Sequence, residues 1–379
     1  MTLAAPARKS SRRKVATPRA PVAENRNGAT KAAKRLIFRC WYSVGDIVLL
    51  TAALRDLHRA HPGRFLVDVR TPFDDLWLHN PWLTPMGDDE GEVVECDYAL
   101  MEESNHAPYH AIHGFIEHLN RTLGLRIRPT EFRGDIHLHP LERAWTPQVA
   151  EMLGADGPCW VIAAGGKTDG TIKWGAPERW QAVVDHFRGR ILLVQAGAAR
   201  DRHPPLRGVL DLRGKTDVRQ LVRLIHHSVG VLCPITSLMH LAAAVPPREG
   251  RPKNRACVVV AGGREPVQWA AYPHHQFLHT LGALPCCDQG GCWKARTVPL
   301  HDGDTARDAS LCVDPVGSGR LRKEKWLPRC MSMITPGDVI RAIEGYHQRG
   351  VLGYLTRREA KLADRFVTLT PRTVKEPRR

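Results

Sequence analysis

The 379-residue sequence has no long apolar run. No segment approaches the roughly 18 consecutive apolar residues of a membrane-spanning helix, and the N-terminus lacks the apolar stretch of a secretory signal. No G-x-G-x-x-G follows the first apolar segment, which argues against a dehydrogenase, and the absence of G-x-x-x-x-G-K-[ST] argues against a P-loop ATPase. We therefore expect a cytoplasmic globular protein whose ligand loops are of another kind.

The net charge is +16, but the excess of basic residues lies at the two ends of the chain and not between them. Residues 1–35 carry ten Lys/Arg against one Glu, and residues 357–379 carry eight against three acidic side chains. The rest is nearly balanced, so we predict no specific nucleic-acid binding. We interpret residues 1–34 as a basic disordered tail and residues 351–379 as a basic C-terminal tail. The tails are either simply solvated or make peripheral contact with the anionic inner face of a membrane.

Short apolar strands alternate with helical patterns from residue 35 onward, which is typical of an α/β fold with parallel sheets. The pattern runs once through residues 35–145 and restarts in residues 146–350. We therefore predict two Rossmann-like domains, an acceptor domain followed by a donor-nucleotide domain. Expected strands are 36–38, 65–69, 93–94, 136–138, 160–164, 191–194, 209–212, 229–232 and 258–261. Expected helices are 47–57, 110–123, 177–187, 218–227, 237–245 and 336–348. Because ligands of open α/β sheets bind outside the carboxyl ends of strands, the loops there should carry the chemistry.

The first such loop, Cys40-Trp-Tyr-Ser-Val-Gly-Asp46, runs from a strand into a helix. Gly45 permits a tight turn, and Asp46 stands at the helix start. A carboxylate there either caps the helix, a role worth about 1 kcal/mol, or acts as general base for a hydroxyl acceptor. The sequence leaves both interpretations open.

The second loop, Gly165-Gly-Lys-Thr-Asp-Gly-Thr-Ile-Lys-Trp174, is rich in glycine and cations. Its exposed amides, hydroxyls and ammonium groups suit a diphosphate, although a solvated loop is the alternative. The residues that supply these groups are Gly165, Gly166, Lys167, Thr168, Thr171 and Lys173.

The third loop, Cys233-Pro-Ile-Thr-Ser-Leu-Met-His240, starts another helix. Thr236, Ser237 and Leu238 stand at its N-terminus, where free amides and the helix dipole favour an anion. His240 taken alone is more typical of a packed, hydrogen-bonded residue than of a catalyst.

Together the three loops resemble glycosyltransferase family 9, which contains the lipopolysaccharide heptosyltransferases. The matching stretches span most of residues 35–345. They are Gly45-Asp-Ile-Val-Leu-Leu-Thr-Ala-Ala-Leu54 with Leu57 and Pro62 beyond, Lys173-Trp174 before Pro177-Glu-Arg-Trp180, and Thr236-Ser-Leu-Met-His-Leu-Ala-Ala-Ala244. The resemblance implies a GT-B fold, an inverting mechanism without a catalytic metal, and a nucleotide-diphosphate sugar donor, usually ADP-heptose.

Carried over by motif, Asp46 is the base that deprotonates the acceptor hydroxyl, and Lys173 neutralises the leaving diphosphate. Thr168 lies beside Lys173, the amides of residues 236–238 lie opposite, and His240 belongs to the donor site. One departure from the family is Ile235, which stands where members commonly have an Asp that contacts the donor, with Ser237 in place of the glycine that follows. The resemblance therefore leaves the donor identity open.

Three functions agree with these residues. The first is transfer of a sugar, expected to be heptose, to a hydroxyl of a glycan, lipopolysaccharide or protein. The second is a sugar-nucleotide epimerase or hydrolase on the same fold, which also needs diphosphate loops. The third is a catalytically silent GT-B protein that binds glycans or partners, an option to which Ile235 adds weight.

Five of the ten cysteines fall in a segment rich in Gly, Asp and Arg, residues 285–331, which we interpret as an insertion in the C-terminal half. Four thiolates make a closed tetrahedral site that would cross-link a segment with little core of its own. We expect one structural zinc or iron bound by Cys287, Cys292, Cys312 and Cys330, with Cys286 as the alternative to Cys287. The resemblance adds that some autotransporter heptosyltransferases carry a four-cysteine iron site. Redox-active or unligated thiols are the alternative.

Overall fold

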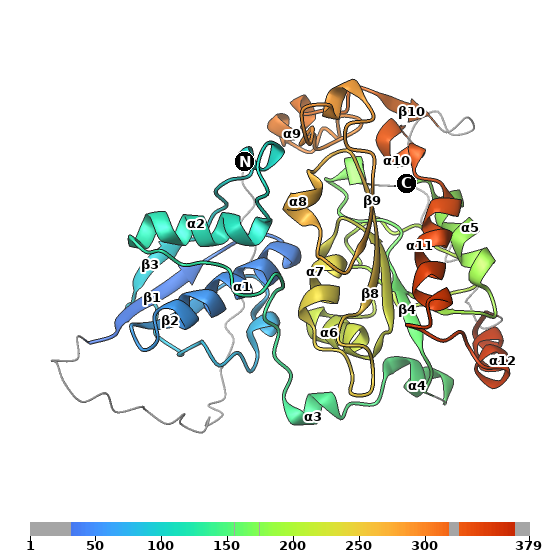
Figure 1. Cartoon of the computed structure of the whole chain (residues 1–379), viewed down its shortest axis with the longest axis horizontal. Helices are drawn as coiled ribbons and strands as arrows, with labels where there is room; N and C mark the ends of the chain where they lie inside the picture. The colour runs from blue at the N-terminus through green and yellow to red at the C-terminus, as the bar shows by residue number, and fades with distance from the viewer. Residues whose placement is uncertain (1–31, 155, 174, 318–325, 368–379) are drawn as a thin grey trace. The chain divides into compact units, whose positions relative to one another are not determined.

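The computed structural model describes residues 32–154, 156–173, 175–317 and 326–367 (Figure 1). The chain divides into a unit of residues 1–32 and a unit of residues 33–379, and every helix and strand below belongs to the second unit. Residues 1–31 of the predicted N-terminal tail, residues 368–379 of the predicted C-terminal tail and Trp174 lie outside the described residues, and Lys34, predicted as the end of the tail, begins the first strand.

The first half of this unit forms a three-stranded parallel sheet in the order β2-β1-β3. Its strands are β1 (Lys34–Arg39), β2 (Phe65–Arg70) and β3 (Glu92–Glu95), and its helices are α1 (Val44–Ala60) and α2 (Ala111–Leu123), with the short turns η1 (Asp74–Trp77) and η2 (Glu103–Asn105). Leu36, Ile37 and Phe38 are fully buried, as expected of a central strand. The strand expected at 136–138 is absent, because this buried segment has no strand partner and instead connects the two halves.

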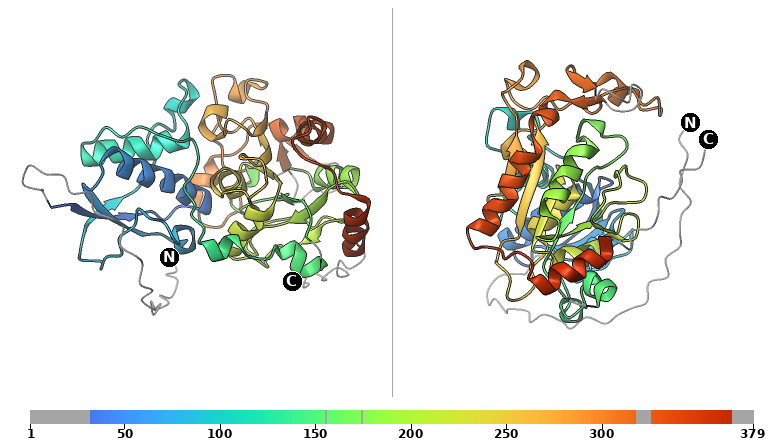
Figure 2. Two further views of the ribbon diagram at one scale, coloured as in Figure 1. Left: turned by 60° about the horizontal axis from the view of Figure 1, so that its bottom comes forward. Right: turned by 90° about the vertical axis from the view of Figure 1, so that its right-hand side faces the viewer.

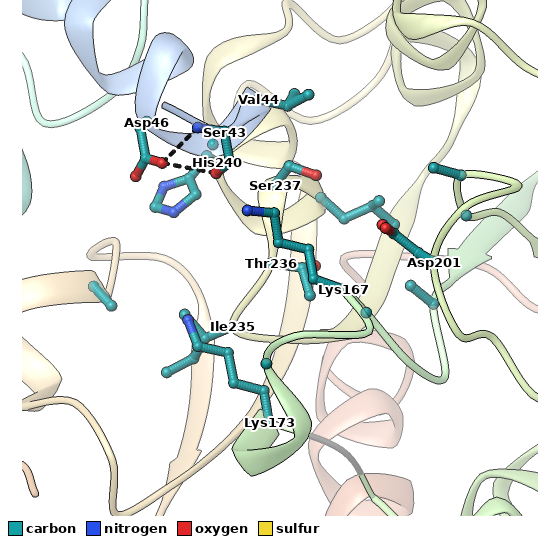
Figure 3. Close-up of a pocket in the computed structure, with 18 of the residues that line it drawn as sticks. Ser43, Val44, Asp46, Lys167, Lys173, Asp201, Ile235, Thr236, Ser237 and His240 are labelled. Atoms are coloured by element: carbon teal, nitrogen blue, oxygen red, sulfur yellow. Dashed lines mark hydrogen bonds between the residues drawn. The ribbon is translucent and has the colours of Figure 1, made fainter. Parts of the chain in front are cut away.

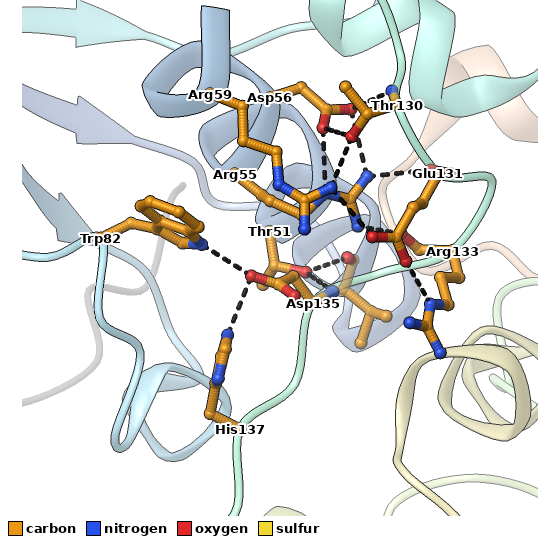
Figure 4. A network of polar contacts seen from close by, with 11 residues as sticks. Thr51, Arg55, Asp56, Arg59, Trp82, Thr130, Glu131, Arg133, Asp135 and His137 are labelled. Atoms are coloured by element: carbon orange, nitrogen blue, oxygen red, sulfur yellow. Dashed lines mark hydrogen bonds and ion pairs between the residues drawn. The ribbon is translucent and has the colours of Figure 1, made fainter. Parts of the chain in front are cut away.

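That connection is fixed to α1 by a buried polar network (Figure 4). The Arg55 guanidinium donates to the Arg133 and Glu131 carbonyls, both at 2.9 Å, and Asp56 accepts the Thr130 hydroxyl and amide. Arg55 and Asp56 are at most 1% exposed, yet the pair is fully hydrogen-bonded, as buried charges must be. The network determines the direction in which the chain leaves the first half.

The second half contains a six-stranded parallel sheet in the order β6-β5-β4-β7-β8-β9. Its strands are β4 (Cys159–Ile162), β5 (Leu192–Gln195), β6 (Leu210–Asp211), β7 (Gly230–Pro234), β8 (Ala256–Gly262) and β9 (Gln276–His279). The chain order reverses at β4, with β5 on one side and β7 on the other. In open sheets of this kind the ligand crevice lies at the reversal point.

Helices cover both faces of the six-stranded sheet (Figures 1 and 2). On one face, α5 (Pro177–Phe187) and α11 (Pro336–Gln348) pack against inward residues such as Trp160 and Val258. On the other, α6 (Val218–His227) and α7 (Ser237–Ala244) pack against Val161 and Val259. This alternation confirms the parallel α/β pattern read from the sequence. The other elements are α3 (Pro140–Arg143), α4 (Gln148–Leu153), η3 (Thr171–Lys173), α8 (Val267–Ala270), η4 (Pro285–Cys287), α9 (Thr305–Ala309), β10 (Pro315–Gly317), β11 (Trp326–Pro328), α10 (Arg329–Met333) and α12 (Arg357–Val367).

Close approach between α1 and α7 brings the two halves together. A Cβ on Gly45 would lie 2.9 Å from His240 Cδ2 and 3.5 Å from Ser237 Cα, so only glycine fits without a shift. A Cβ on Gly134 would likewise lie too close to Val48 and Ala244. Among the described helices, none has both the length and the apolar character to cross a bilayer.

Candidate active site between the two halves

A cavity of about 410 Å³ lies where the first loop of each half meets the N-terminus of α7 (Figure 3). Its walls come from the loops after β1, β4, β5, β7 and β8, all at the carboxyl ends of their strands. The reversal point of the larger sheet, between β4 and β7, lies at its floor. The cavity therefore occupies the position that the topology predicts for a ligand.

Asp46 lines this cavity and also caps α1, so its position agrees with both interpretations, a helix cap and a general base. Its Oδ2 accepts the Ser43 amide at 2.9 Å and the Ser43 hydroxyl at 2.7 Å, which closes a capping box. Its Oδ1 accepts a short hydrogen bond from the Tyr98 hydroxyl. A carboxylate held by three donors is firmly oriented, and it lines the cavity.

Lys173 lies across the cavity in η3 and forms an ion pair with Glu265, whose Oε1 is 2.6 Å from the Lys173 Nζ. Arg264 also contacts this carboxylate. Burial lowers the pKa of Lys173, although Glu265 opposes the shift. Burial raises the pKa of Glu265, but Lys173 and Arg264 outweigh it and bring the value down to about 2. Glu265 is therefore ionised at neutral pH, and Lys173, 31% exposed, lines the cavity beside it.

The N-terminus of α7 faces the same space. Thr236, Ser237 and Leu238 all line the cavity, as does Ile235. The Thr236 hydroxyl is buried, and no hydrogen-bond partner for it occurs among the described residues. Free amides at a helix start and an unsatisfied hydroxyl together suit an anionic ligand. The cavity wall at Ile235 is apolar, because this side chain has no hydrogen-bonding capacity.

His240 is held one turn further along α7. Its Nδ1 is 2.8 Å from the Tyr272 hydroxyl, and its ring packs against Gly45. Burial, the largest effect, lowers the pKa of His240 to about 4, although Asp46 and Glu265 oppose the shift. The imidazole is therefore neutral at physiological pH, and it fits a hydrogen-bonding role toward a ligand rather than that of a cation.

The glycine-rich loop divides into residues that reach the cavity and residues that support it. Gly166 and Lys167 line the cavity, whereas the lining drawn from the described residues does not include Gly165, Thr168 or Thr171. A Cβ on Gly165 would lie 1.9 Å from the Arg202 carbonyl, so this glycine allows the loop to pair with the next one. The buried Thr171 hydroxyl accepts the Thr297 amide at 2.8 Å. The diphosphate contacts predicted for Gly165, Thr168 and Thr171 thus have no support in this geometry.

Four residues that line the cavity were not predicted from the sequence. Tyr98, Glu265, Trp269 and Trp293 line the cavity beside the predicted residues. Glu265 could have been predicted from the sequence, because it follows a buried strand in Val258-Val-Val-Ala-Gly-Gly-Arg-Glu265. No sequence pattern indicates Tyr98, since it lies beyond a short edge strand without a motif.

The five cysteines of the 285–331 segment gather around one small cavity, which Ile172 and Gly263 also line. Cys287 and Cys330 both contact Gly263, where a Cβ would lie 3.0 Å from the Cys287 Sγ. Burial, followed by the neighbouring thiols, raises the pKa of Cys286 and of Cys330 to about 11. Over the described part of the chain, no three His, Cys, Asp or Glu side chains are arranged as ligands of one metal ion. The predicted clustering is confirmed, whereas ligation stays a prediction.

Comparison with solved structures identifies the fold class as GT-B. The iron-containing dodecameric glycosyltransferase TibC from enterotoxigenic E. coli H10407 is 16% identical with a TM-score of 0.53, covering 84% of this chain and 77% of TibC. A second TibC structure, in complex with ADP-D-β-D-heptose, gives a TM-score of 0.52 at 16% identity over 85% of this chain and 78% of that one.

The ADP-heptose lipopolysaccharide heptosyltransferase II of E. coli is 12% identical with a TM-score of 0.50, covering 82% of this chain and 98% of that enzyme. No protein-family model and no curated protein sequence matches the chain. The expected similarity in fold to heptosyltransferases is confirmed, and at this identity the likeness establishes the fold alone.

Proposed function

We propose that this protein is an inverting glycosyltransferase that transfers heptose from ADP-heptose to a hydroxyl of a glycan, lipopolysaccharide or protein. The observation that carries the proposal is a single cavity in which an oriented carboxylate faces an ammonium group and a helix N-terminus from the opposite half. The ADP-heptose bound to TibC, which shares the fold, favours this donor.

In the proposed reaction the acceptor oxygen attacks the anomeric carbon while the bond from that carbon to the diphosphate breaks. Asp46 takes the proton of the attacking hydroxyl, and the nucleoside diphosphate leaves with the bonding electron pair. Lys173, Lys167 and the amides of residues 236–238 would neutralise the leaving group without a catalytic metal. Charge stabilisation at the leaving group is expected to supply most of the rate enhancement.

The test combines donor binding with turnover. ADP-heptose should raise the melting temperature of the wild type, since a ligand that binds only the native state stabilises it. With a suitable acceptor, Asp46→Asn should abolish transfer while leaving nucleotide affinity nearly intact. Lys173→Ala should weaken nucleotide binding and slow transfer by about 2–4 kcal/mol.

Each alternative has its own outcome. If the donor is consumed without an acceptor and this consumption depends on Asp46, the epimerase or hydrolase function is favoured. A lack of response to every ADP-, UDP- and GDP-sugar would favour the silent binding protein. Turnover that persists in Asp46→Asn would reduce Asp46 to a helix cap.

We also propose one structural metal, zinc or iron, in the cysteine cluster. The donor set fits a thiophilic metal, since five thiols share one small cavity. The proposed ligands are Cys287, Cys292, Cys312 and Cys330, with Cys286, which lines the same cavity, as the alternative to Cys287. Cys287, the ligand preferred from sequence, has its Sγ 3.4 Å from the Leu284 carbonyl and is almost fully buried. Such a metal would cross-link the segment and take no part in transfer.

We propose that the protein is located in the cytoplasm and that its basic tails contact the membrane surface. Co-sedimentation with anionic vesicles at increasing salt would test that contact, because electrostatic attachment weakens with ionic strength.

A further inference from the structure

The Asp46 carboxylate has few acceptor positions left for a substrate. An ionised carboxylate offers about four lone-pair sites. The Ser43 amide and hydroxyl occupy both sites on Oδ2, at 2.9 and 2.7 Å, and the Tyr98 hydroxyl occupies one on Oδ1. Among the described residues, the recorded partners thus leave one lone pair, on Oδ1.

Tyr98 is itself tightly held. Its ring stacks on Tyr42, with centroids 5.7 Å apart, and packs against Phe115 at 4.3 Å. Trp269, from the other half of the protein, completes the enclosure at 5.7 Å. The phenol oxygen consequently has little freedom to leave Asp46, and its position depends on contacts from both halves.

A glycine makes this packing possible. A Cβ on Gly114 of α2 would lie 3.2 Å from Tyr98 Cδ1, 2.9 Å from Trp269 Cη2 and 2.6 Å from the Ala99 carbonyl. A glycine inside a helix costs about 0.5–1 kcal/mol relative to alanine. Here it lets both rings reach the position from which Tyr98 contacts the carboxylate.

From these contacts, and resting on the proposed transfer reaction, we propose that Tyr98 is the positioning residue of the base. Its hydroxyl fixes the rotation of the Asp46 carboxylate, so that the remaining lone pair of Oδ1 receives the proton of the acceptor hydroxyl. Tyr98 does not itself touch the reacting atoms. It also stabilises the ionised carboxylate, and it ties the orientation of the base to Trp269 across the cavity.

Other groups also act on Asp46, and a pH experiment must hold them constant. They come from β1 and the loop after it, from η3 and from α7, and they are Cys40, Tyr42, Lys173 and His240. Tyr98→Phe removes one hydroxyl and leaves these four groups unchanged. Tyr346→Phe is the control, because it removes a tyrosine hydroxyl outside the cavity, which donates to the His274 carbonyl at 2.9 Å rather than to Asp46.

The experiment measures kcat, KM and the pH profile of kcat/KM for the full-length wild type and both variants. In Tyr98→Phe, kcat should fall roughly 10- to 100-fold while the donor KM changes less than about twofold. The acid limb of the profile should move to higher pH, because a carboxylate that loses a donor holds its proton more tightly. Tyr346→Phe should match the wild type. A wild-type rate and profile in Tyr98→Phe would overturn the proposal.

A second measurement does not depend on transfer. In protein labelled with ¹³C at aspartate carboxyls, the signal missing from Asp46→Asn identifies Asp46, and its titration midpoint should rise in Tyr98→Phe. If no sugar nucleotide is turned over, the proposed function fails, yet this titration still decides whether Tyr98 controls the carboxylate. Should Tyr98→Phe not fold, Tyr98→Met, an apolar side chain that likewise removes the hydroxyl donor, serves in the same titration. An unmoved midpoint in the folded variant refutes the inference.

Discussion

The ion pair across the cavity gives the sharpest stability prediction. Glu265 is 7% exposed and lies 2.6 Å from Lys173, with Arg264 beside it. Glu265→Gln keeps the shape of the side chain but removes its charge. Two cations then remain together without their carboxylate partner, and breaking a buried pair in this way is destabilising.

The size of the effect follows from the protonation of Glu265. Lys173 and Arg264 overcome the opposing effect of burial and bring its pKa from 4.5 to about 2. That difference corresponds to roughly 3 kcal/mol. Because Lys173 is 31% exposed, solvent screening reduces the expected loss in unfolding free energy to about 1–3 kcal/mol at pH 7.

The pH dependence has a definite sign. A carboxyl whose folded-state pKa is depressed stabilises the protein above its unfolded value, here 4.5, and loses that contribution as the pH falls toward 2. The difference between wild type and Glu265→Gln should therefore be complete at pH 7 and smaller at pH 4.

The assay is urea denaturation of the wild type, Glu265→Gln, Lys173→Met and the double variant at both pH values. Coupling predicts that the double variant loses less stability than the two single losses together. Glu344→Gln, which removes a carboxylate paired with Arg190 outside the cavity, is the control. Strict additivity, or a Glu265→Gln loss that does not change with pH, would refute this account of the pair.

Three further predictions concern packing, the metal and the contact between the halves. Gly45→Ala should lower the free energy of unfolding by about 1–3 kcal/mol and reduce turnover, because its Cβ would lie 2.9 Å from the His240 imidazole. Gly345→Ala has open space around its Cβ and should stabilise α11 by about 0.5–1 kcal/mol. Thermal unfolding measures both changes. Elemental analysis should find about one equivalent of zinc or iron, lost together with thermal stability in a Cys312→Ser, Cys330→Ser double variant; an equally stable, metal-free wild type would contradict the site. Arg219→Met should lower the free energy of unfolding in urea by about 3–5 kcal/mol, because it removes the guanidinium that lies 2.5 Å from the Glu142 carboxylate and leaves His79, at 3.6 Å, as its ionisable partner; a loss below 1 kcal/mol would show that this contact is dispensable.

The sequence alone determined the local elements and the class of fold. Buried strands followed by amphipathic helices have periods that depend only on neighbouring residues, so α2, α5 and α11 were predicted nearly to the residue. The loops after β1, β4 and β7 were predicted to carry the site for the same reason, since parallel strands place their carboxyl ends on one edge. Where the pattern was weak the prediction failed, as for the strand expected at 136–138.

Only the tertiary structure decided which side chains face one another. A motif shows that Asp46 begins a helix, but the contact with Tyr98 joins residues 52 positions apart, and the pair of Lys173 with Glu265 joins residues 92 positions apart. Such contacts depend on helix packing angles, on glycines that allow close approach and on the burial of charge, none of which local periodicity encodes. The same reason separates Gly166, which reaches the cavity, from its neighbour Gly165, whose lack of a side chain serves the packing of two loops.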